Sequence, residues 1–401
     1  MASVVNIKIE PAKMLTMAAE LDLTKAAVHR NPDSLQVRLR LAQLLNKLDM
    51  FSASIDTLAR YNADHPSLMA MRTLITAHFA RNNSDDDLSA QRLAERALPF
   101  ANTDIERSYL FAELSKALLR MGQPQSAIPL LWQALELDPS NANAFKRLVY
   151  ELLHQQQPQQ VVALTDKLKQ MGVSHSRLLA SRAMALAAAG HPDAAQQLLG
   201  AGQFLHAEHI QAPSGWANLS AFNAAVANEV SSNPDLRFER YGTSSQKARR
   251  VDHPATGATP AVSALLVEIA RIATAHAASF SASDHWWASV RPLAATLRSW
   301  CVITEGNGYE KWHMHPEGWM SGGYYVEVPD GVAYGGDEAG CLAFGIPDGL
   351  IGEEAAHSVQ LVQIRPTPGL LTLFPSHAYH RTFPHNKEGR RMCIAFDIRP
   401  T

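Results

Sequence analysis

The chain has 401 residues, of which 46% are hydrophobic and 18% are charged, and its formal net charge is −2 at pH 7. A chain of this length exceeds one ordinary hydrophobic core, so at least two domains are expected. The small net charge argues against a general electrostatic binder of nucleic acid, and no nucleic-acid partner is expected. The three cysteines, Cys301, Cys341 and Cys393, are too few for a disulfide framework and favour a reducing compartment.

The amino-terminal residues also bear on location. They show no basic segment followed by an apolar one, which a secretory signal would require. We find no continuous apolar run of eighteen or more residues, the length that a membrane span needs. We therefore expect no membrane contact and a cytoplasmic protein.

The first half of the chain contains an internal repeat. Gly122, Ala127, Ala134 and Pro139 are separated by five, seven and five residues. Small residues at such spacing let two antiparallel helices cross closely, and the proline ends the second helix where its missing N–H costs little. The spacing therefore predicts a pair of packed helices between residues 108 and 141.

A shift of 34 residues carries Gly122 to Gln156, and a second shift carries it to Gly190. This periodicity resembles the tetratricopeptide repeat, with Ser115 at another of the positions where that family has small residues. The match is closest over residues 108–141, and weaker copies precede and follow it. We expect about five units over residues 10–205, which exceeds the number a solenoid needs.

The resemblance to tetratricopeptide repeats implies an α-solenoid of helical hairpins. Its amphipathic periodicity is what such an array requires. The concave face of the array is expected to bind a protein or peptide partner. The alternative is that the repeats serve only as a structural platform.

The composition changes after about residue 206. Residues 242–246 and 254–260 are rich in Gly, Ser, Thr and Pro, which predicts loops. We therefore expect residues 206–260 to form a linker region. Apolar periodicity then predicts a helix over 261–278 and another over 284–297, with Ser283 and Asp284 as its cap.

From residue 299 onward the apolar period becomes two, with Gly and Pro turns between short runs. Such a run of short strands predicts an all-β sandwich or barrel, and a jelly roll fits their number. The two preceding helices would buttress one sheet, so residues 261–401 are expected to form one domain of an α+β multidomain chain. The expected strands are residues 300–304, 309–315, 320–328, 340–344, 359–364, 370–374 and 391–398.

Three histidines near the end of the chain suggest a metal site. His313 and His315 are two residues apart, so on a strand their side chains project to the same side. His380 lies in a later strand and could complete the set. Imidazole suits Fe, Zn, Ni and Cu. His377 and His385 are expected to be surface or supporting residues.

Four ordered segments surround these histidines. They are H-M-H-P at 313–316, S-G-G-Y-Y at 321–325, F-P-S at 374–376 followed by His380, and R-M-C-I-A-F at 391–396. Residues 299–400 thereby resemble an Fe(II)- and 2-oxoglutarate-dependent oxygenase of the prolyl-hydroxylase-like branch. The resemblance implies a double-stranded β-helix that uses O2, converts 2-oxoglutarate to succinate and CO2, and hydroxylates a substrate.

The resemblance also implies metal ligands. His313 and His380 match the two histidines of the family's facial triad. The position that usually holds a carboxylate, two residues after the first histidine, holds His315 here. His315 is therefore expected either to complete a three-histidine triad or to support it. Asp330 and Asp337 are the alternative sources of a carboxylate.

A second set of residues matches the part of the family that binds the co-substrate. Arg391 would pair with the far carboxylate of 2-oxoglutarate through a charge-assisted fork. The hydroxyl of Tyr325 would reach the same carboxylate. Ser321 and Cys393 are also expected at the cofactor, although a cysteine replaces the family's usual serine at the second of these positions.

The leading functional hypothesis is an oxygenase that acts on a protein or peptide delivered by the repeats. The first alternative keeps this chemistry but gives it a small-molecule substrate, with the repeats as a scaffold. A second alternative is a cupin-type metalloprotein that does not use 2-oxoglutarate, in which Glu317 would stand too close to the H-x-H pair and Arg391 would have no role. A third is a repeat adaptor with a degenerate barrel.

Overall fold

The computed structural model describes residues 5–280 and 285–401, and the chain divides into two compact units. The first, which we call the repeat unit, comprises Met17–Gln155 and Lys167–Val173. The second, the β unit, comprises Met1–Thr16, Gln156–Asp166 and Ser174–Thr401. We describe each unit by itself.

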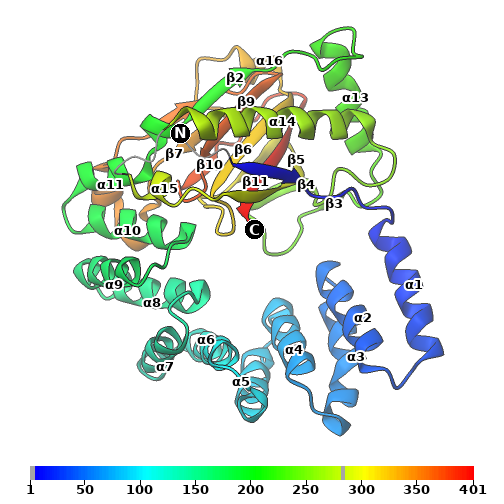
Figure 1. Cartoon of the computed structure of the whole chain (residues 1–401), viewed down its shortest axis with the longest axis vertical. Helices are drawn as coiled ribbons and strands as arrows, with labels where there is room; N and C mark the ends of the chain where they lie inside the picture. Colours follow the sequence, from blue (N-terminus) through cyan, green and yellow to red (C-terminus); the bar gives the residue numbers. More distant parts are fainter. Residues whose placement is uncertain (1–4, 281–284) are drawn as a thin grey trace. The chain divides into compact units, whose positions relative to one another are not determined.

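The repeat unit consists of helices that follow one another as hairpins, coloured blue to cyan in Figure 1. Helices α2 and α3, α4 and α5, and α6 and α7 pack in consecutive pairs. Helix α9 (Pro158–Gln170) crosses the boundary between the units. The other helices are α1 (Met17–Arg30), α2 (Leu35–Lys47), α3 (Phe51–Asp64), α4 (Leu68–Arg81), α5 (Asp86–Ala97), η1 (Leu98–Phe100), α6 (Asp104–Arg120), α7 (Pro124–Leu137) and α8 (Ala142–His154).

The turn positions of the repeat adopt a common backbone conformation. The φ angle is +74° at Gly122, +57° at Gln156 and +82° at Gly190, each 34 residues after the last. A left-handed residue after a helix lets the chain reverse, and glycine adopts it without steric cost. The 34-residue periodicity seen in the sequence therefore corresponds to a repeated turn, which glutamine occupies once.

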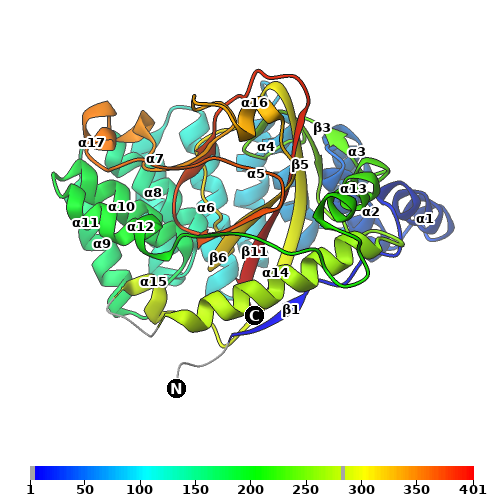
Figure 2. The same cartoon turned by 90° about the horizontal axis from the view of Figure 1, so that it is seen from above.

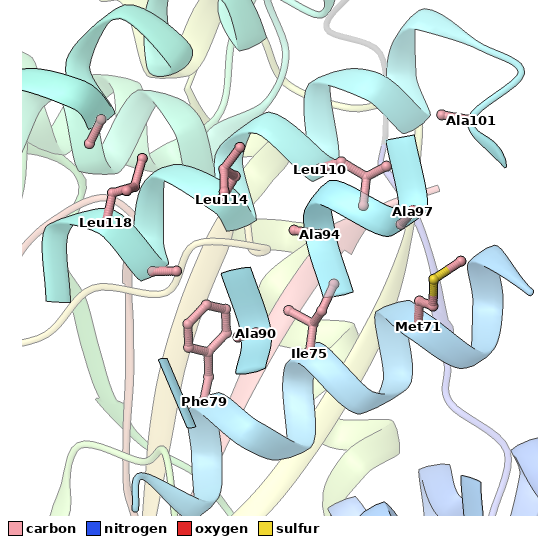
Figure 3. Close-up of a cluster of buried hydrophobic side chains, with 12 residues drawn as sticks. Met71, Ile75, Phe79, Ala90, Ala94, Ala97, Ala101, Leu110, Leu114 and Leu118 are labelled. Atoms are coloured by element: carbon pink, nitrogen blue, oxygen red, sulfur yellow. The ribbon is translucent and has the colours of Figure 1, made fainter. Parts of the chain in front are cut away.

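Small side chains bring the helices of the repeat unit together. Ser115, Ala127 and Ala134 are fully buried. The hydroxyl of Ser115 donates to the carbonyl of Ala127 at 3.2 Å, and that of Ser108 donates to the carbonyl of Ala134 at 2.7 Å. Figure 3 shows the adjoining core, in which larger side chains of α4 and α6 close over alanines of α5. The predicted hairpin at 108–141 is confirmed.

The β unit is built on two sheets. The major sheet has the strand order β2-β9-β6-β11-β5-β4-β3, with β1 paired in parallel to the start of β5, and the minor sheet has the order β10-β7-β8. This arrangement agrees with the predicted jelly roll. The strands are β1 (Asn6–Ile9), β2 (His206–His209), β3 (Arg237–Phe238), β4 (Ser245–Val251), β5 (Ala294–Glu310), β6 (Met320–Glu327), β7 (Leu342–Phe344), β8 (Val362–Ile364), β9 (Leu370–Pro375), β10 (His380–Thr382) and β11 (Arg390–Pro400).

The two faces of the major sheet have different neighbours. The Tyr324 hydroxyl donates to Oδ1 of Asn223 on α13 (Leu219–Ser231) at 2.6 Å, whereas Tyr325 points to the other face of β6. Helix α14 (Pro260–Ser279) packs against α13 and β1, and Figure 2 shows it lying beside β1. The remaining helices are α10 (Ser176–Ala188), α11 (Pro192–Leu199), α12 (Ala201–Phe204), α15 (Trp286–Ser289), α16 (Asp330–Ala333), η2 (Asp348–Leu350) and α17 (Glu353–His357).

The expected domain boundaries differ from the structure. Residues 206–260, predicted to be a linker region, contribute β2, β3 and β4 to the major sheet and α13 to its cover. Residues 174–205, predicted to end the repeat array, cluster with the β unit, as do residues 1–16. Short polar runs such as Ser245–Val251 reveal a strand only when a long partner, here β5, completes their hydrogen bonds.

The second helix predicted before the barrel is wrong over most of its length. Helix α15 covers only Trp286–Ser289, and Ala294–Leu297 belong to β5. These residues pair with β1 on one side and with β11 on the other, so tertiary pairing overrides their helical propensity. The cap expected at Ser283 and Asp284 lies outside the described residues.

One described helix, α14, is long and apolar enough by composition to cross a membrane, with a mean hydropathy of 1.4 over its best window. Half of that window is buried within the structure. Its buried residues include Leu265, Ile269 and Ile272, which repeat at helical spacing. A core helix that packs against a sheet has the same composition, so this feature is weak support for a membrane span.

Candidate metal centre

Backbone hydrogen bonds bring the two ligand-bearing segments together. The N–H of His313 donates to the carbonyl of His380, and the N–H of His380 donates to that of His313, both at 2.9 Å. Two residues later the N–H of His315 donates to the carbonyl of Ser376 at 2.9 Å. His313 and His315 follow the end of β5 and are not part of a regular strand as predicted, but this pairing keeps their segment extended.

The three imidazole rings converge. Their candidate ligand atoms all lie within 4.8 Å of one another. The ring centroids of His313 and His380 are 4.1 Å apart, those of His315 and His380 4.9 Å, and those of His313 and His315 5.3 Å. His315 and His380 are buried, and His313 is partly exposed. The side chains predicted to bind metal are therefore together in space.

Each ring is held by an oxygen acceptor at Nδ1. Nδ1 of His313 lies 2.7 Å from the carbonyl oxygen of Lys311, and Nδ1 of His380 lies 3.0 Å from that of Ala378. Nδ1 of His315 lies 2.6 Å from a carboxylate oxygen of Asp397. Because these oxygens accept, each Nδ1 donates its proton, which leaves every Nε2 of the neutral rings with a lone pair for a metal.

Burial favours the neutral form of the His313 and His380 rings. It lowers the pKa of His313 from its ordinary value, although the nearby Glu310 acts in the opposite direction. Burial likewise lowers the pKa of His380 well below its ordinary value, and the neighbouring His313 and His315 add to the effect. Neutral imidazole is the form that binds a metal, so two of the three rings are prepared for ligation.

Asp397 supports His315 from behind. Its Oδ1 also accepts from the Ser321 hydroxyl at 2.8 Å, and the same hydroxyl lies 2.6 Å from that of Ser376. Burial alone would raise the pKa of Asp397, but His315, Ser321 and Arg399 outweigh it and hold the pKa below its ordinary value. A carboxylate in this position fixes the ring's orientation and increases its basicity as a ligand.

The rings open onto a small cavity of about 30 Å3 between the two sheets. Most of the residues that line it alternate along the strands, as the pleat requires, whereas Gly322 and Gly323 are adjacent on β6. Its lining is Trp300 and Glu310 of β5, His313 and His315, Gly322, Gly323 and Tyr325 of β6, Leu342 of β7, Thr372 and Phe374 of β9, His380 and Thr382 of β10, and Arg391, Cys393 and Ala395 of β11.

Arg391 places a buried positive charge in this cavity. Its side chain is 3% exposed, and its guanidinium carbon lies 5.0 Å from the ring centroid of Tyr325. Its Nε is buried and has no hydrogen-bond acceptor within the described chain. Beside it, burial raises the pKa of the Cys393 thiol to about 12, so this side chain is uncharged. An anionic ligand would supply the acceptor that Arg391 lacks.

Most of the predicted site residues meet at this cavity, and one does not. His313, His315, His380, Arg391, Tyr325 and Cys393 all line it. Ser321, expected at the cofactor, lies instead behind His315 in contact with Asp397. It shares a face of β6 with Gly323 and Tyr325, but it lies nearer the start of the strand, where its neighbour on β11 is Asp397.

Two functional candidates were missed in the sequence. Asp397 follows Arg391, Cys393 and Ala395 at the period of two, so counting along the strand would have placed it on the same face. Glu310 ends β5 and lines the cavity, but nothing in the sequence distinguished it from other acidic residues near a strand end.

The alternative ligands have other partners. Asp337 is exposed and pairs with Lys387 at 3.0 Å, and Asp330 is exposed at the start of α16. His377 and His385 are both buried and not at the surface, and they contact the backbone carbonyls of Leu198 and Thr304 respectively. Within the described residues, His313, His315 and His380 form the one group arranged for a metal.

A larger cavity, of about 290 Å3, lies elsewhere in the β unit. It borders Trp287 and Trp319, whose rings stack at 4.7 Å, and it includes none of the three histidines. Size alone would favour this cavity over the one at the histidines. The convergent ligands and the buried arginine instead assign the chemistry to the smaller one.

Comparison with known families agrees with this assignment. Residues 298–397 match a family model described as "Putative 2OG-Fe(II) oxygenase". The matched segment contains all three histidines, Arg391 and Asp397. The resemblance to 2-oxoglutarate-dependent oxygenases is thereby confirmed for this part of the β unit, and the match supports this kind of enzyme. No curated protein matches the sequence at a significant level.

Several solved structures show partial similarity to this chain. A Pseudomonas putida prolyl-4-hydroxylase is 13% identical, with a TM-score of 0.34, and the alignment covers 50% of this chain and 96% of that one. YrrB, a TPR protein, is 17% identical, with a TM-score of 0.33 and coverage of 45% and 90%. TTC0263, a TPR protein of Thermus thermophilus, is 20% identical, with a TM-score of 0.32 and coverage of 38% and 81%.

Proposed function

We propose that this chain is an Fe(II)- and 2-oxoglutarate-dependent dioxygenase that hydroxylates a protein or peptide recruited by its repeat unit. One observation carries the proposal. One ring nitrogen from each of three histidines converges at a cavity that also contains a buried arginine, whose Nε has no acceptor among the described residues. A cupin without 2-oxoglutarate would explain the histidines but would leave this buried charge without a purpose.

The donor set fits ferrous iron. His313, His315 and His380 would hold it through three neutral nitrogens, and Asp397 would keep His315 in place. Three protein ligands would leave positions on the metal for 2-oxoglutarate and O2. When bound, iron and 2-oxoglutarate supply the oxidising chemistry: O2 is consumed and 2-oxoglutarate loses CO2 to become succinate.

The co-substrate site fits a dicarboxylate with one condition. Arg391 would bind the carboxylate far from the metal, and the Tyr325 hydroxyl would reach the same group. The present free volume, about 30 Å3, is roughly that of a single water molecule. A five-carbon dicarboxylate therefore enters when lining side chains such as Phe374 move aside.

The repeat unit supports the choice of a protein or peptide substrate. Arrays of helical hairpins present extended surfaces to such partners. In this unit Arg72 lies over the ring of Tyr109 at 4.0 Å and Lys116 lies over that of Phe79 at 3.9 Å. Burial lowers the pKa of Lys116 to about 8, against the opposing effect of Glu113. These half-buried cations are suited to contact polar groups of a partner.

The first experiment tests the oxygenase chemistry. The apoprotein would be titrated with Fe(II) and 2-oxoglutarate without oxygen while the visible charge-transfer band of the ternary complex is followed. Air would then be admitted and succinate measured. We expect a band and succinate production, both strongly reduced in Arg391→Ala. Iron binding without any response to 2-oxoglutarate would favour the cupin alternative, and absence of metal binding would favour the adaptor.

A second experiment tests the substrate class. The active enzyme would be incubated with a size-fractionated cell extract under 18O2, and label incorporation would be followed separately in proteins and in small molecules. We expect label in protein, reduced when Lys116 and Arg72 are both changed to glutamate while succinate formation without substrate persists. Label confined to the small-molecule fraction would establish the alternative substrate class.

A further inference from the structure

Glu310 occupies a defined position beside the metal centre. It is the last residue of β5, where it pairs with Ser245 of β4. Its backbone N–H donates to the Thr382 hydroxyl at 2.9 Å, and Thr382 follows His380 by two residues on β10. The side chain lines the same cavity as the histidines. Pairing with β4 and the hydrogen bond to the Thr382 side chain therefore hold Glu310 close to His380.

The carboxylate of Glu310 is poorly satisfied. Oε1 has weak contacts, at 3.3 Å with the Ser245 hydroxyl and 3.4 Å with that of Ser244. Among the described residues, Oε2 has no hydrogen-bond donor, and no basic nitrogen approaches either oxygen within 4.0 Å. A half-buried carboxylate in this state is costly unless a ligand completes it.

The neighbouring cations are committed elsewhere. Arg250 forms an ion pair with Asp252 at 2.8 Å and lies over the ring of Trp300. Arg391 lies over Tyr325 and is the residue proposed to receive 2-oxoglutarate. Burial would raise the pKa of Glu310, but the surrounding histidines and arginines outweigh it and lower the pKa, so the group is a carboxylate at neutral pH. Its charge remains available to a ligand.

Two partners can be set aside on geometry and charge. Glu310 does not belong to the group of ligand atoms that lie within 4.8 Å of one another, so it is not arranged as a metal ligand. A second carboxylate, such as that of 2-oxoglutarate, would be repelled by it. Of the described residues that line the cavity, Glu310 is the one acid and Arg391 the one strong base. The cavity thus offers one anchor for an anion and one for a cation.

We propose that Glu310 binds the ammonium or guanidinium group of a lysine or arginine side chain in the substrate. This inference rests on the proposed oxygenase function and gives its substrate a chemical class. An N–H of the cation would donate to Oε2 in a charge-assisted hydrogen bond, which is shorter and stronger than a neutral one. The same contact would place the substrate's aliphatic stem beside the metal.

The test uses the full chain loaded with Fe(II) and 2-oxoglutarate without oxygen. Substrate binding next to the metal perturbs the visible charge-transfer band, so binding can be titrated without turnover. The probes are the N-acetyl amides of lysine, arginine, glutamine and glutamate, with free lysine and arginine as small-molecule counterparts. We expect the basic amides to bind at least about tenfold more tightly than the glutamine amide. Tighter binding of the free amino acids than of the amides would point to a small-molecule source.

Glu310→Gln should remove most of this preference and leave the band itself unchanged. Glu310→Asp, which keeps the charge on a shorter side chain, should retain part of it. The matched control is Glu305→Gln on the same strand, whose exposed carboxylate pairs with Arg249 outside the cavity. It should bind all probes as the unaltered chain does.

The outcomes separate this inference from the proposed function. A normal band with equal binding of basic and neutral amides in the unaltered chain overturns the role of Glu310 but leaves the oxygenase intact. A Glu310→Gln variant that loses iron affinity, or changes only its affinity for 2-oxoglutarate, also overturns it. Absence of any band in the unaltered chain contradicts the proposed function itself.

Discussion

The repeat unit and the β unit obtain their structures from contacts of different range. In the repeat unit, α6 and α7 are adjacent in the chain and meet through Ser115 and Ala127, twelve residues apart. In the β unit, the first strand β1 pairs with β5, and His313 pairs with His380 across several intervening strands. Local contacts repeat and can be recognised by their period, whereas distant contacts occur once each.

This difference determines how far the effect of a substitution should spread within each unit. A change in the repeat unit should alter the packing of one hairpin and its neighbours. A change at the metal centre should affect residues from both sheets, because they share one cavity. Five sets of substitutions test this contrast.

The largest effect is expected at the histidines. His313→Ala and His380→Ala should each abolish iron binding, because two neutral nitrogens hold Fe(II) far less well than three. Measured by anaerobic iron titration, affinity should fall by more than about a hundredfold in both. The exposed His357→Ala provides the control. Unchanged iron affinity in either variant would remove that histidine from the site.

The next largest effect is expected for Arg391→Ala. Loss of the guanidinium removes the anchor for the far carboxylate, so the 2-oxoglutarate concentration needed for half-maximal band formation should rise about a hundredfold. Iron affinity should change by no more than a fewfold. Arg391→Lys keeps the charge but not the fork, and should recover only part of the loss. A parallel fall in iron affinity would indicate collapse of the cavity instead.

Asp397→Asn tests how far the hydrogen bond between His315 and Asp397 supports iron binding. An amide is a weaker acceptor for the His315 Nδ1–H than a carboxylate, and it can also present its NH2 group. We expect iron affinity to fall roughly 10–100-fold with the dependence on 2-oxoglutarate unchanged. His315→Ala should reduce it further if His315 is a ligand. Equal effects of the two substitutions would mean that His315 contributes to iron binding only while Asp397 holds its ring.

A substitution in the repeat unit should be local. Ala127 is fully buried where α6 and α7 cross, so Ala127→Leu should destabilise the hairpin by about 1–3 kcal/mol. Denaturant unfolding monitored by amide exchange should show the loss in α6 and α7. Gln125→Leu, at an exposed site on α7, is the control. The contrast between units fails if Ala127→Leu also weakens iron binding.

The smallest effects are expected at the turns. Gly122 has a φ of +74° and open space around it, so Gly122→Ala should cost about 1 kcal/mol through backbone strain alone. Gln156 adopts the same conformation with a side chain, so Gln156→Gly should be neutral or stabilising by up to about 1 kcal/mol. Opposite signs in thermal unfolding would support the shared turn. Loss of stability in both variants would contradict it.

Sequence patterns predicted the repeat unit and the last strands well for a physical reason. Gly122 and Ala127 act through neighbours within one hairpin, and Arg391 lies in a strand whose own alternation marks it. Residues 206–260 were mistaken for a linker because β4 gains its hydrogen bonds only from β5, which follows much later in the chain. Ala294–Leu297 were mistaken for a helix because nothing nearby reveals their pairing with β1.

The candidate site shows the same limit. The motif residues were found, but Glu310 was missed because its place in the cavity depends on β10 and β11, which complete the lining. Ser321 was placed at the cofactor because the motif contains it, and its contact with Asp397 depends on the register between β6 and β11. Residue identity indicates a type of chemistry, and strand register determines which residues take part.

The paired backbone hydrogen bonds between His313 and His380 bear on the stability of these segments in the apoprotein. Those bonds involve no metal, so the frame that carries the ligands should persist when iron is withdrawn by a chelator. A zinc finger, by contrast, unfolds when its metal leaves. We therefore expect slow amide exchange at both histidines in the apoprotein, and rapid, repeated recovery of the centre whenever ferrous iron returns.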